Sequence, residues 1–383
     1  MDYDEDIIRA QSDLVASLTG VSPECMFEVA KALQGVGLTA NYIPLSKDRY
    51  ETLTLEELRA PVTTNGFRLC KYYSDAYVNV ADKRVNYSRQ ALFEQTVHLS
   101  YPKVFNDPFD CVPRADKDII RNTLVSDLAS YLGITSSSTD DCWCLMCKIA
   151  KVLNTPEADR PQLACTSYSL QCIDLQTMCL SMVCEAKRRN GLTSGIVFEV
   201  VEGNVRNILA RVGLCRIACF GRSPHNLYMW AHYASDHTGF CAEYETNLNV
   251  LKARGFDGAS LGLLLCSMFN VFYCPDRPDA TEEVIAFMRH CLDDEGLARF
   301  YSKILCIKSP DWTFEQELRL IVQDVNLPDN LPFFPVRRIY LGSRMDDDKA
   351  KGLVAYCREH GVEVVRMAPS AEGFALEEHV LVP

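Results

Sequence analysis

The chain has 383 residues, of which 48% are hydrophobic and 23% charged, and its formal net charge is −12. This length suffices for one large domain or two ordinary ones, and the composition is typical of a globular protein. Its acidic residues are spread along the chain, and a negative surface repels phosphate backbones, so duplex nucleic acid is disfavoured as a partner. The longest apolar stretches are too short to span a bilayer and the N-terminus is acidic, so we expect no membrane association and a cytoplasmic location.

The chain contains 18 cysteines, which in a cytoplasmic protein are expected to be reduced and mostly buried among apolar residues. The closest group, Cys142, Cys144 and Cys147, has two interpretations. The three thiolates could bind zinc with a fourth ligand from elsewhere. Alternatively, they form one face of a helix, because the run continues into the helical sequence 148–152. We favour the helix and therefore predict no metal site.

The first 60 residues predict a helical appendage. Apolar residues between Asp6 and Leu18 follow helical spacing, and Ser22 is a suitable cap for a second helix. An aromatic-rich strand is expected over Phe67–Tyr73, and a second extended segment over Val97–Val104.

Residues 115–190 predict a helical insertion. It contains an amphipathic helix over Asp116–Leu132 and a long helix over Ile173–Arg189, whose last turn is basic. Because strands are expected on both sides, this block interrupts a sheet-forming core domain that spans residues 61–370.

The second half of the chain predicts further strands separated by helices. The expected helices cover Asn226–Asp236, Glu282–Leu305 and Asp346–His360. The expected strands are Gly195–Val201, Leu214–Phe220, Phe240–Glu245, Phe314–Val322, Val336–Gly342 and Val362–Met367. The predicted fold class is therefore α+β, with a mixed or antiparallel sheet and with residues 371–383 as a C-terminal tail.

Five phrases resemble a bacterial family known as domain of unknown function 2971, and they occur in that family's order. They are Leu69–Tyr73; Ser100–Pro102 with Phe105–Cys111; Cys219–Phe220 with Met229–Ala234 and Gly239–Cys241; Lys308, Trp312 and Phe314–Leu320; and Ile339–Met345. One departure is that Gly221 follows Cys219–Phe220, where the family usually has serine. The resemblance implies no function.

The segment Phe314–Val322 carries the sharpest chemical signal. On a strand, Glu315, Glu317 and Arg319 would project from one face. This could be a charged outer face on which Arg319 neutralises Glu317. Alternatively, the Glu-x-Glu pattern resembles the third motif of ADP-ribosyltransferases, which implies NAD as the cofactor.

That resemblance assigns roles to the three charged residues. Cleavage of the bond between nicotinamide and ribose develops oxocarbenium-like charge, which Glu317 would stabilise. Glu315 would accept a proton from the attacking group. Arg319 would belong to the cofactor-binding set.

The two earlier motifs of that fold have candidates as well. Arg68, Lys71 and Tyr72, on the first strand, offer cations and a ring for a dinucleotide. Ser223, followed by a helix that presents Trp230 and Tyr233 on one face, would complete the cofactor site. The structural alternatives are an ordinary amphipathic strand and an aromatic stripe that packs into the core.

The turn Asn106–Asp110 also has two interpretations. Asn106 can bond to its own backbone while Pro108 fixes φ, which makes a structural turn beside the site. Alternatively, Asn106, Asp107 or Asp110 contacts a ligand hydroxyl or a metal.

Three functions remain open from the sequence. The first is an NAD-using transferase that acts on a protein, a nucleic acid or a small molecule. The second, disfavoured because close ligand spacing is lacking, is a metal-dependent hydrolase or nuclease that uses Asp107, Asp110, His232, Glu315 and Glu317. The third is a non-catalytic sensor or interaction module.

Overall fold

A computed structural model describes most of the chain: residues 66–81, 83–112, 114–155, 170–212, 215–255, 267–289, 303–322 and 328–383, with Cys291, Gly296 and Phe300. The N-terminal appendage expected over residues 1–60 lies outside this part. The chain divides into two compact units. Unit 1 takes its described residues from the segment that ends at Asp110, from Leu214–Arg277 and from Cys306–Pro383, and unit 2 takes them from Cys111–Gly213 and Pro278–Leu305.

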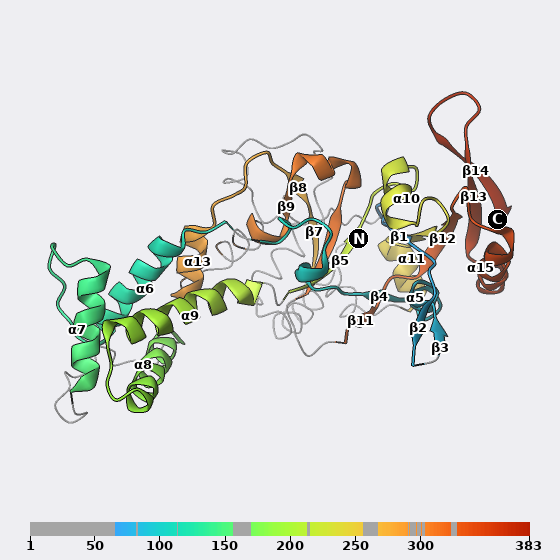
Figure 1. Ribbon diagram of the computed structural model, residues 1–383. Helices are drawn as coiled ribbons and strands as arrows, with labels where there is room; N and C mark the ends of the chain where they lie inside the picture. Colours follow the sequence, from blue (N-terminus) through green and yellow to red (C-terminus); the bar gives the residue numbers. More distant parts are fainter. Residues whose placement is uncertain are drawn as a thin grey trace. The chain divides into compact units, whose positions relative to one another are not determined.

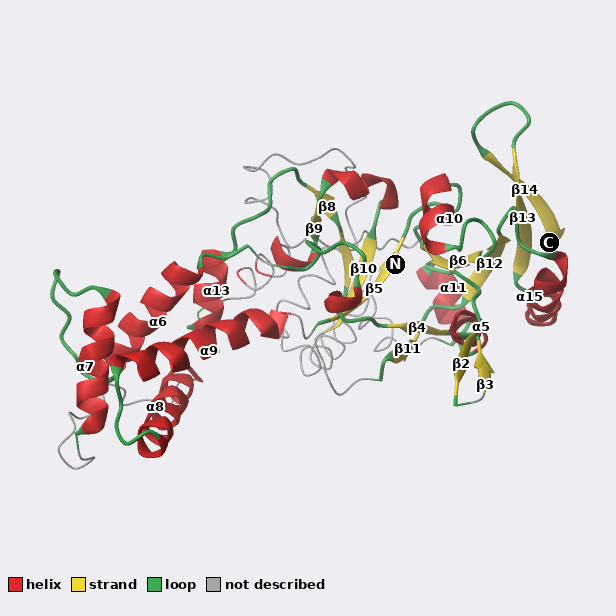
Figure 2. Cartoon of the chain, in the orientation of Figure 1, coloured by secondary structure: helices red, strands yellow, loops and turns green. Residues whose placement is uncertain are grey.

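The larger sheet of unit 1 has five strands in the order β1-β6-β12-β13-β14. All neighbours are antiparallel except β12 and β13, which run parallel and are connected by helix α15. The elements are β1 (Cys70–Tyr73), β6 (Phe240–Tyr244), β12 (Val336–Leu341), α15 (Asp347–His360), β13 (Glu363–Pro369) and β14 (Leu376–Val382), and Figure 2 shows the strands and helix by colour.

A second, three-stranded antiparallel sheet joins the first through a backbone bridge. Its order is β5-β10-β7, formed by Arg216–Phe220, Leu318–Val322 and Met268–Asn270. Cys70 of β1 donates to the Gly221 carbonyl at 2.9 Å, and Gly221 donates back to the Cys70 carbonyl at 2.7 Å. The end of β5 therefore lies beside β1, which brings the two sheets together.

The two faces of the five-stranded sheet bury different side chains, as strand alternation requires. Phe240, Ala242 and Ile339 face the cluster that contains buried residues of α15. On the other face, Cys241 and Tyr340 pack with α10 (Leu227–Tyr233), and Figure 1 labels both helices near this sheet.

Short elements complete unit 1. They are β2 (Val78–Val80), β3 (Lys83–Val85), α5 (Tyr87–Phe93), β4 (Thr96–His98), η1 (Pro102–Val104), α11 (Leu248–Ala253), β8 (Phe272–Tyr273), β9 (Ile307–Lys308), η3 (Pro310–Glu315) and β11 (Asn330–Pro332). The extended segment predicted over Val97–Val104 is therefore a short strand followed by a 3-10 turn.

Unit 2 consists of helices in its described residues: α6 (Lys117–Tyr131), α7 (Cys142–Asn154), α8 (Leu170–Arg188), α9 (Ser194–Val212) and α13 (Thr281–Met288). The expected insertion at 115–190 lies inside this unit, which continues beyond it. The strand predicted over Gly195–Val201 is wrong, because these residues belong to α9. Val197, Val201 and Val205 recur at helical spacing and are all buried. The predicted strand covered only seven residues, and within so short a segment this spacing is also compatible with the alternation of a strand.

The C-terminal part differs from the expectation in one respect. Residues 371–383, predicted as a tail, contain β14, which pairs antiparallel with β13. By contrast, the helix expected to begin after Asp346 is confirmed. The Asp346 carboxylate accepts from the backbone N–H groups of Asp348 and Lys349, and Gly361 ends the helix at φ 64°.

Helices and mixed sheets make the protein α+β, as the sequence predicted. In the part of the chain that the structure describes, no helix combines the length and the apolar character needed to cross a bilayer.

Candidate functional site

The Glu-x-Glu segment is a turn that leads into a strand. Glu315 ends the 3-10 helix η3, Gln316 takes the left-handed conformation at φ 46°, and β10 begins only at Leu318. The prediction of one continuous strand over Phe314–Val322 is therefore wrong for its first four residues. The left-handed turn at Gln316, rather than strand alternation, places both glutamates beside Lys308.

Five charged side chains form one buried cluster, here called the charge cluster: Asp110, Lys308, Glu315, Glu317 and Arg319. Each of them is between 0% and 6% exposed. Lys308 Nζ lies 2.6 Å from Glu315 Oε2 and 3.4 Å from both Glu317 Oε2 and Asp110 Oδ2. An unpaired buried charge is very costly, so these ion pairs are needed for the five side chains to be buried.

Arg319 holds the other side of the charge cluster. Its Nε donates to Glu317 Oε1 at 2.9 Å and its Nη2 to Glu317 Oε2 at 3.0 Å, while Nη2 also reaches Asp110 Oδ2 at 2.7 Å. The carboxylate of Glu317 is thus fixed by two cations. The backbone N–H of Glu317 donates to the Tyr273 hydroxyl at 3.0 Å, which fixes the chain as well.

The two glutamates differ in acidity. Burial opposes ionisation of Glu317, but the charges of Arg319 and Lys308 outweigh it and lower its pKa to about 2. Burial and the charge of Glu317 raise the pKa of Glu315 to about 7, although Lys308 and Tyr233 partly offset them. At neutral pH one carboxyl is therefore ionised, and its neighbour can gain or lose a proton.

A chain of hydrogen bonds connects Glu315 to the surface. The Tyr233 hydroxyl, on α10, donates to Glu315 Oε1 at 2.5 Å, and the amide of exposed Asn106 donates to the Tyr233 oxygen at 3.1 Å. Burial, followed by the charge of Glu315, raises the pKa of Tyr233. Tyr233 therefore stays protonated and orients the carboxyl.

Lys71 approaches the charge cluster from β1. Its ammonium donates to the Cys219 carbonyl of β5 at 3.0 Å. Burial lowers the pKa of Lys71, while the charges of Cys219 and Glu317 oppose that shift.

Aromatic rings gather on the surface side of η3 and form what is here called the aromatic cluster: Tyr228, His232, Trp312 and Phe314. The Phe314 ring is central, with centroids 5.3 Å from Tyr228, 5.7 Å from His232 and 5.9 Å from Trp312. Lys308 Nζ lies 4.7 Å from the centre of the Trp312 ring, so the aromatic and charge clusters adjoin. Tyr228 and His232 are exposed.

The structure brings most of the sequence-predicted site residues together. Glu315, Glu317 and Arg319 belong to the charge cluster, and Lys71, Tyr233 and Asn106 lead into it. Arg68 does not join them: its exposed side chain lies 3.7 Å from Glu243 of β6.

Three other predicted residues lie together, on the side of β1 that faces away from Lys71. The Tyr72 hydroxyl donates to the Ser223 carbonyl at 2.6 Å, and the Tyr72 ring meets Trp230 edge-on at 5.2 Å. Trp230 is 0% exposed and donates its indole N–H to the Pro224 carbonyl at 2.7 Å. The expectation that Trp230 binds a cofactor is corrected here, because its ring is packed inside the core and offers no surface to a ligand.

Sequence reasoning missed several residues of this region. Lys308, Trp312 and Phe314 belong to the phrases that resemble the family, but the sequence assigns them no role. Asp110 is expected there only as a contact to a ligand hydroxyl or a metal. The sequence contains one indication of this arrangement. Pro310 predicts a turn or a helix start two residues after Lys308.

A metal ion has no evident place in this part of the molecule. The carboxylates of the charge cluster are engaged by Lys308 and Arg319. Across the described ranges, no group of three or more His, Cys, Asp or Glu residues is arranged to hold a metal. Cys142, Cys144 and Cys147 lie on the first turns of α7, which Asp141 caps.

Part of the chain matches a known protein family. Residues 229–320, which run from α10 to β10, match the family model described as Protein of unknown function (DUF2971). The matched segment contains Tyr233, Lys308 and both glutamates of the Glu-x-Glu turn. Searches of curated proteins and of solved structures found no match. The family match shows the resemblance to DUF2971 that the five sequence phrases predicted.

Proposed function

We propose that the protein is an NAD-using transferase that resembles ADP-ribosyltransferases, with Glu317 as its central glutamate. The observation that carries this proposal is the pairing of two unlike carboxyls within one cluster. Glu317 is held ionised by Arg319 and Lys308, while the pKa of Glu315 is raised to about 7.

This arrangement suits cleavage of a glycosidic bond. Nicotinamide leaves with the electron pair of its bond to ribose, so positive charge develops on the ribose, and the fixed carboxylate of Glu317 stabilises it. The acceptor then forms the new bond to ribose and loses a proton. Glu315, whose pKa is raised to about 7, accepts that proton.

The neighbouring elements support the same proposal. The Tyr233–Glu315 hydrogen bond connects the aromatic helix α10 to the Glu-x-Glu turn, and β5 pairs with β10. The aromatic cluster offers exposed rings beside the carboxyls, against which a planar nicotinamide or adenine can stack. The acceptor stays open between a protein, a nucleic acid and a small molecule.

A second candidate is a non-catalytic sensor or interaction module. One observation favours it: every member of the charge cluster is buried and paired, which suffices for a purely structural network. A metal-dependent hydrolase has no such support, because the carboxylates are already engaged by cations.

The deciding experiment is nicotinamide release from NAD by the full chain, followed by chromatography. We expect slow release by the wild type and a loss of about 100-fold or more in Glu317→Gln. Glu359→Gln, which changes an exposed glutamate of α15, is the matched control and should retain the activity. Glu317→Asp keeps the charge but withdraws it from the ribose, so it separates lost chemistry from lost folding.

Folding is checked on the same samples by circular dichroism and thermal unfolding. A wild type that releases no nicotinamide, and whose Tm does not rise with NAD, would refute the transferase. The interaction module would then be the better account of the charge cluster.

A further inference from the structure

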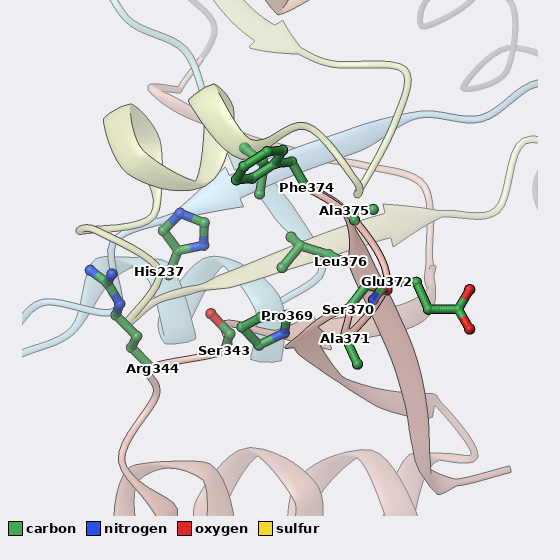
Figure 3. Close-up of a pocket in the computed structure, with 12 residues that line it drawn as sticks. His237, Ser343, Arg344, Pro369, Ser370, Ala371, Glu372, Phe374, Ala375 and Leu376 are labelled. Carbon is green, nitrogen blue, oxygen red and sulfur yellow. Dashed lines mark hydrogen bonds between the residues drawn. The ribbon is translucent and has the colours of Figure 1, made fainter.

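A cavity of about 580 Å³ lies in unit 1, and its lining contains no residue of the charge cluster. It is lined by Leu227 and His237 around α10, by Ser343 and Arg344 after β12, and by the hairpin 369–376 between β13 and β14, as Figure 3 shows. Pockets that hold small ligands commonly have volumes of roughly 300–1,000 Å³. This cavity therefore has the right size for a small molecule.

The backbone holds His237 and Arg344 beside each other. The Arg344 N–H donates to the His237 carbonyl at 3.0 Å. Ser235, Asp236 and His237 all have positive φ, at 46°, 52° and 69°. A Cβ atom on Gly342 would lie 2.1 Å from the His237 oxygen, so this approach requires glycine. Such conformations persist only where surrounding contacts enforce them, so the backbone is held in place at both residues.

His237 carries a polar atom without a partner. Its Nδ1 is buried and, among the described residues, has no hydrogen-bond partner, while its ring lies parallel to Trp230 with centroids 6.1 Å apart. Burial and the charge of Arg344 lower the pKa of His237, so the imidazole is neutral near pH 7. A buried nitrogen without a hydrogen bond carries a desolvation cost.

Arg344 offers a site for an anion. Arg344 is exposed, and among the described residues no ion pair is formed by its guanidinium. Glu372 is the one carboxylate among the lining residues, and in Figure 3 its side chain points away from Arg344 and His237. A guanidinium with the neighbouring Ser343 hydroxyl and an imidazole forms a donor set that suits phosphate oxygens.

The other end of the cavity is apolar. Phe374, at the tip of the β13–β14 hairpin, is fully exposed, and Leu227 and Leu376 also line the cavity. An exposed ring at the rim of a cavity can stack on a planar ligand, which would cover apolar surface that now faces water.

We propose that this cavity binds a small phosphorylated ring compound of the size of a nucleoside monophosphate. Its phosphate contacts Arg344, Ser343 and His237, and its ring packs against Phe374. The proposal goes beyond the transferase activity and does not depend on it, since the cavity and the charge cluster share no residue.

The test is isothermal titration of the full chain with AMP, GMP, CMP and UMP, beside inorganic phosphate and adenosine. We expect at least one of the four nucleotides to bind about tenfold or more tightly than either phosphate or adenosine alone. Arg344→Gln and Phe374→Ser should each weaken that nucleotide about tenfold. Both positions are exposed, so neither variant should disturb folding.

Two controls locate the binding. Arg358→Gln removes an exposed arginine on α15, away from the cavity, and should bind as the wild type does. Glu317→Gln should also bind normally, which separates this cavity from the proposed transferase site. The proposal is overturned if none of the four nucleotides binds at millimolar concentration, if Arg344→Gln binds as well as the wild type, or if phosphate alone matches the best nucleotide.

Discussion

The Tyr233 hydroxyl donates a hydrogen bond of 2.5 Å to Oε1 of Glu315, while Lys308 holds Oε2 of the same carboxyl at 2.6 Å. Both contacts stabilise the ionised form, against burial and the nearby charge of Glu317. The pKa of about 7 is the balance of these opposing effects. Because Tyr233 lies on α10 and Lys308 on β9, the acidity of Glu315 depends on how both elements pack around the Glu-x-Glu turn.

Tyr233→Phe should raise the pKa of Glu315, since it removes a hydrogen bond that favours the carboxylate. In the proposed transferase Glu315 accepts a proton, so the rising limb of the pH–rate profile should move to higher pH. Tyr228→Phe, on the exposed side of the same helix, is the control and should leave the profile in place. An unchanged profile in Tyr233→Phe would mean that Glu315 does not control the rate.

The stability of the protein should also depend on Glu315. Its pKa is raised in the folded state, from 4.5 to about 7, so the stabilisation is complete below pH 4.5 and is lost as the pH rises through 7. The free energy of unfolding should therefore fall between pH 4.5 and 7, by at most about 1.4 kcal/mol per pH unit. Urea unfolding of Glu315→Gln should show a flatter pH dependence over this range, and equal slopes in the two proteins would contradict the shift.

Glu317 should have the opposite effect at lower pH. Its folded-state pKa is lowered from 4.5 to about 2, so its stabilisation is present above pH 4.5 and is lost as the pH falls through 2. Acid unfolding of Glu317→Gln, followed by circular dichroism between pH 5 and 2, should lack this component. Glu359→Gln serves again as the control and should unfold as the wild type does.

Arg319→Met should be strongly destabilising, because it leaves Asp110 and Glu317 buried with one cation fewer. Breaking a buried ion pair on one side typically costs about 3–5 kcal/mol. Lys351→Met removes an exposed pair with Asp348 and should cost about 1 kcal/mol or less. Chemical denaturation of both variants gives the comparison, and similar losses would show that the burial of Arg319 contributes little.

Gly342→Ala should destabilise by about 2–4 kcal/mol, because the added Cβ would overlap the His237 carbonyl oxygen at 2.1 Å. Gly373→Ala, in the β13–β14 hairpin, has nothing within 4 Å of the added atom and should change stability by about 0.5 kcal/mol or less. The difference in Tm between the two variants measures the cost of the close approach at the cavity wall. Equal Tm values would show that the loop can move aside.

Features that depend on neighbouring residues were predictable from the amino-acid sequence. The limits of α15 follow from a carboxylate cap at Asp346 and a left-handed glycine at Gly361, both of which form local hydrogen bonds. The α+β class and most of the strands were also predictable, because alternating burial leaves its period in the residues themselves. The Glu-x-Glu pair could be found because its two members are only two residues apart in the chain.

The environment of that pair, by contrast, depends on contacts between residues far apart in the chain. Arg319 and Asp110 are 209 residues apart in sequence and meet at 2.7 Å, and no local pattern records such a contact. The burial of Trp230 likewise depends on a distant segment, because its ring packs against Tyr72 of β1. A pKa depends on burial and on charges that act through space, so the unlike acidities of Glu315 and Glu317 exist only once the chain has folded.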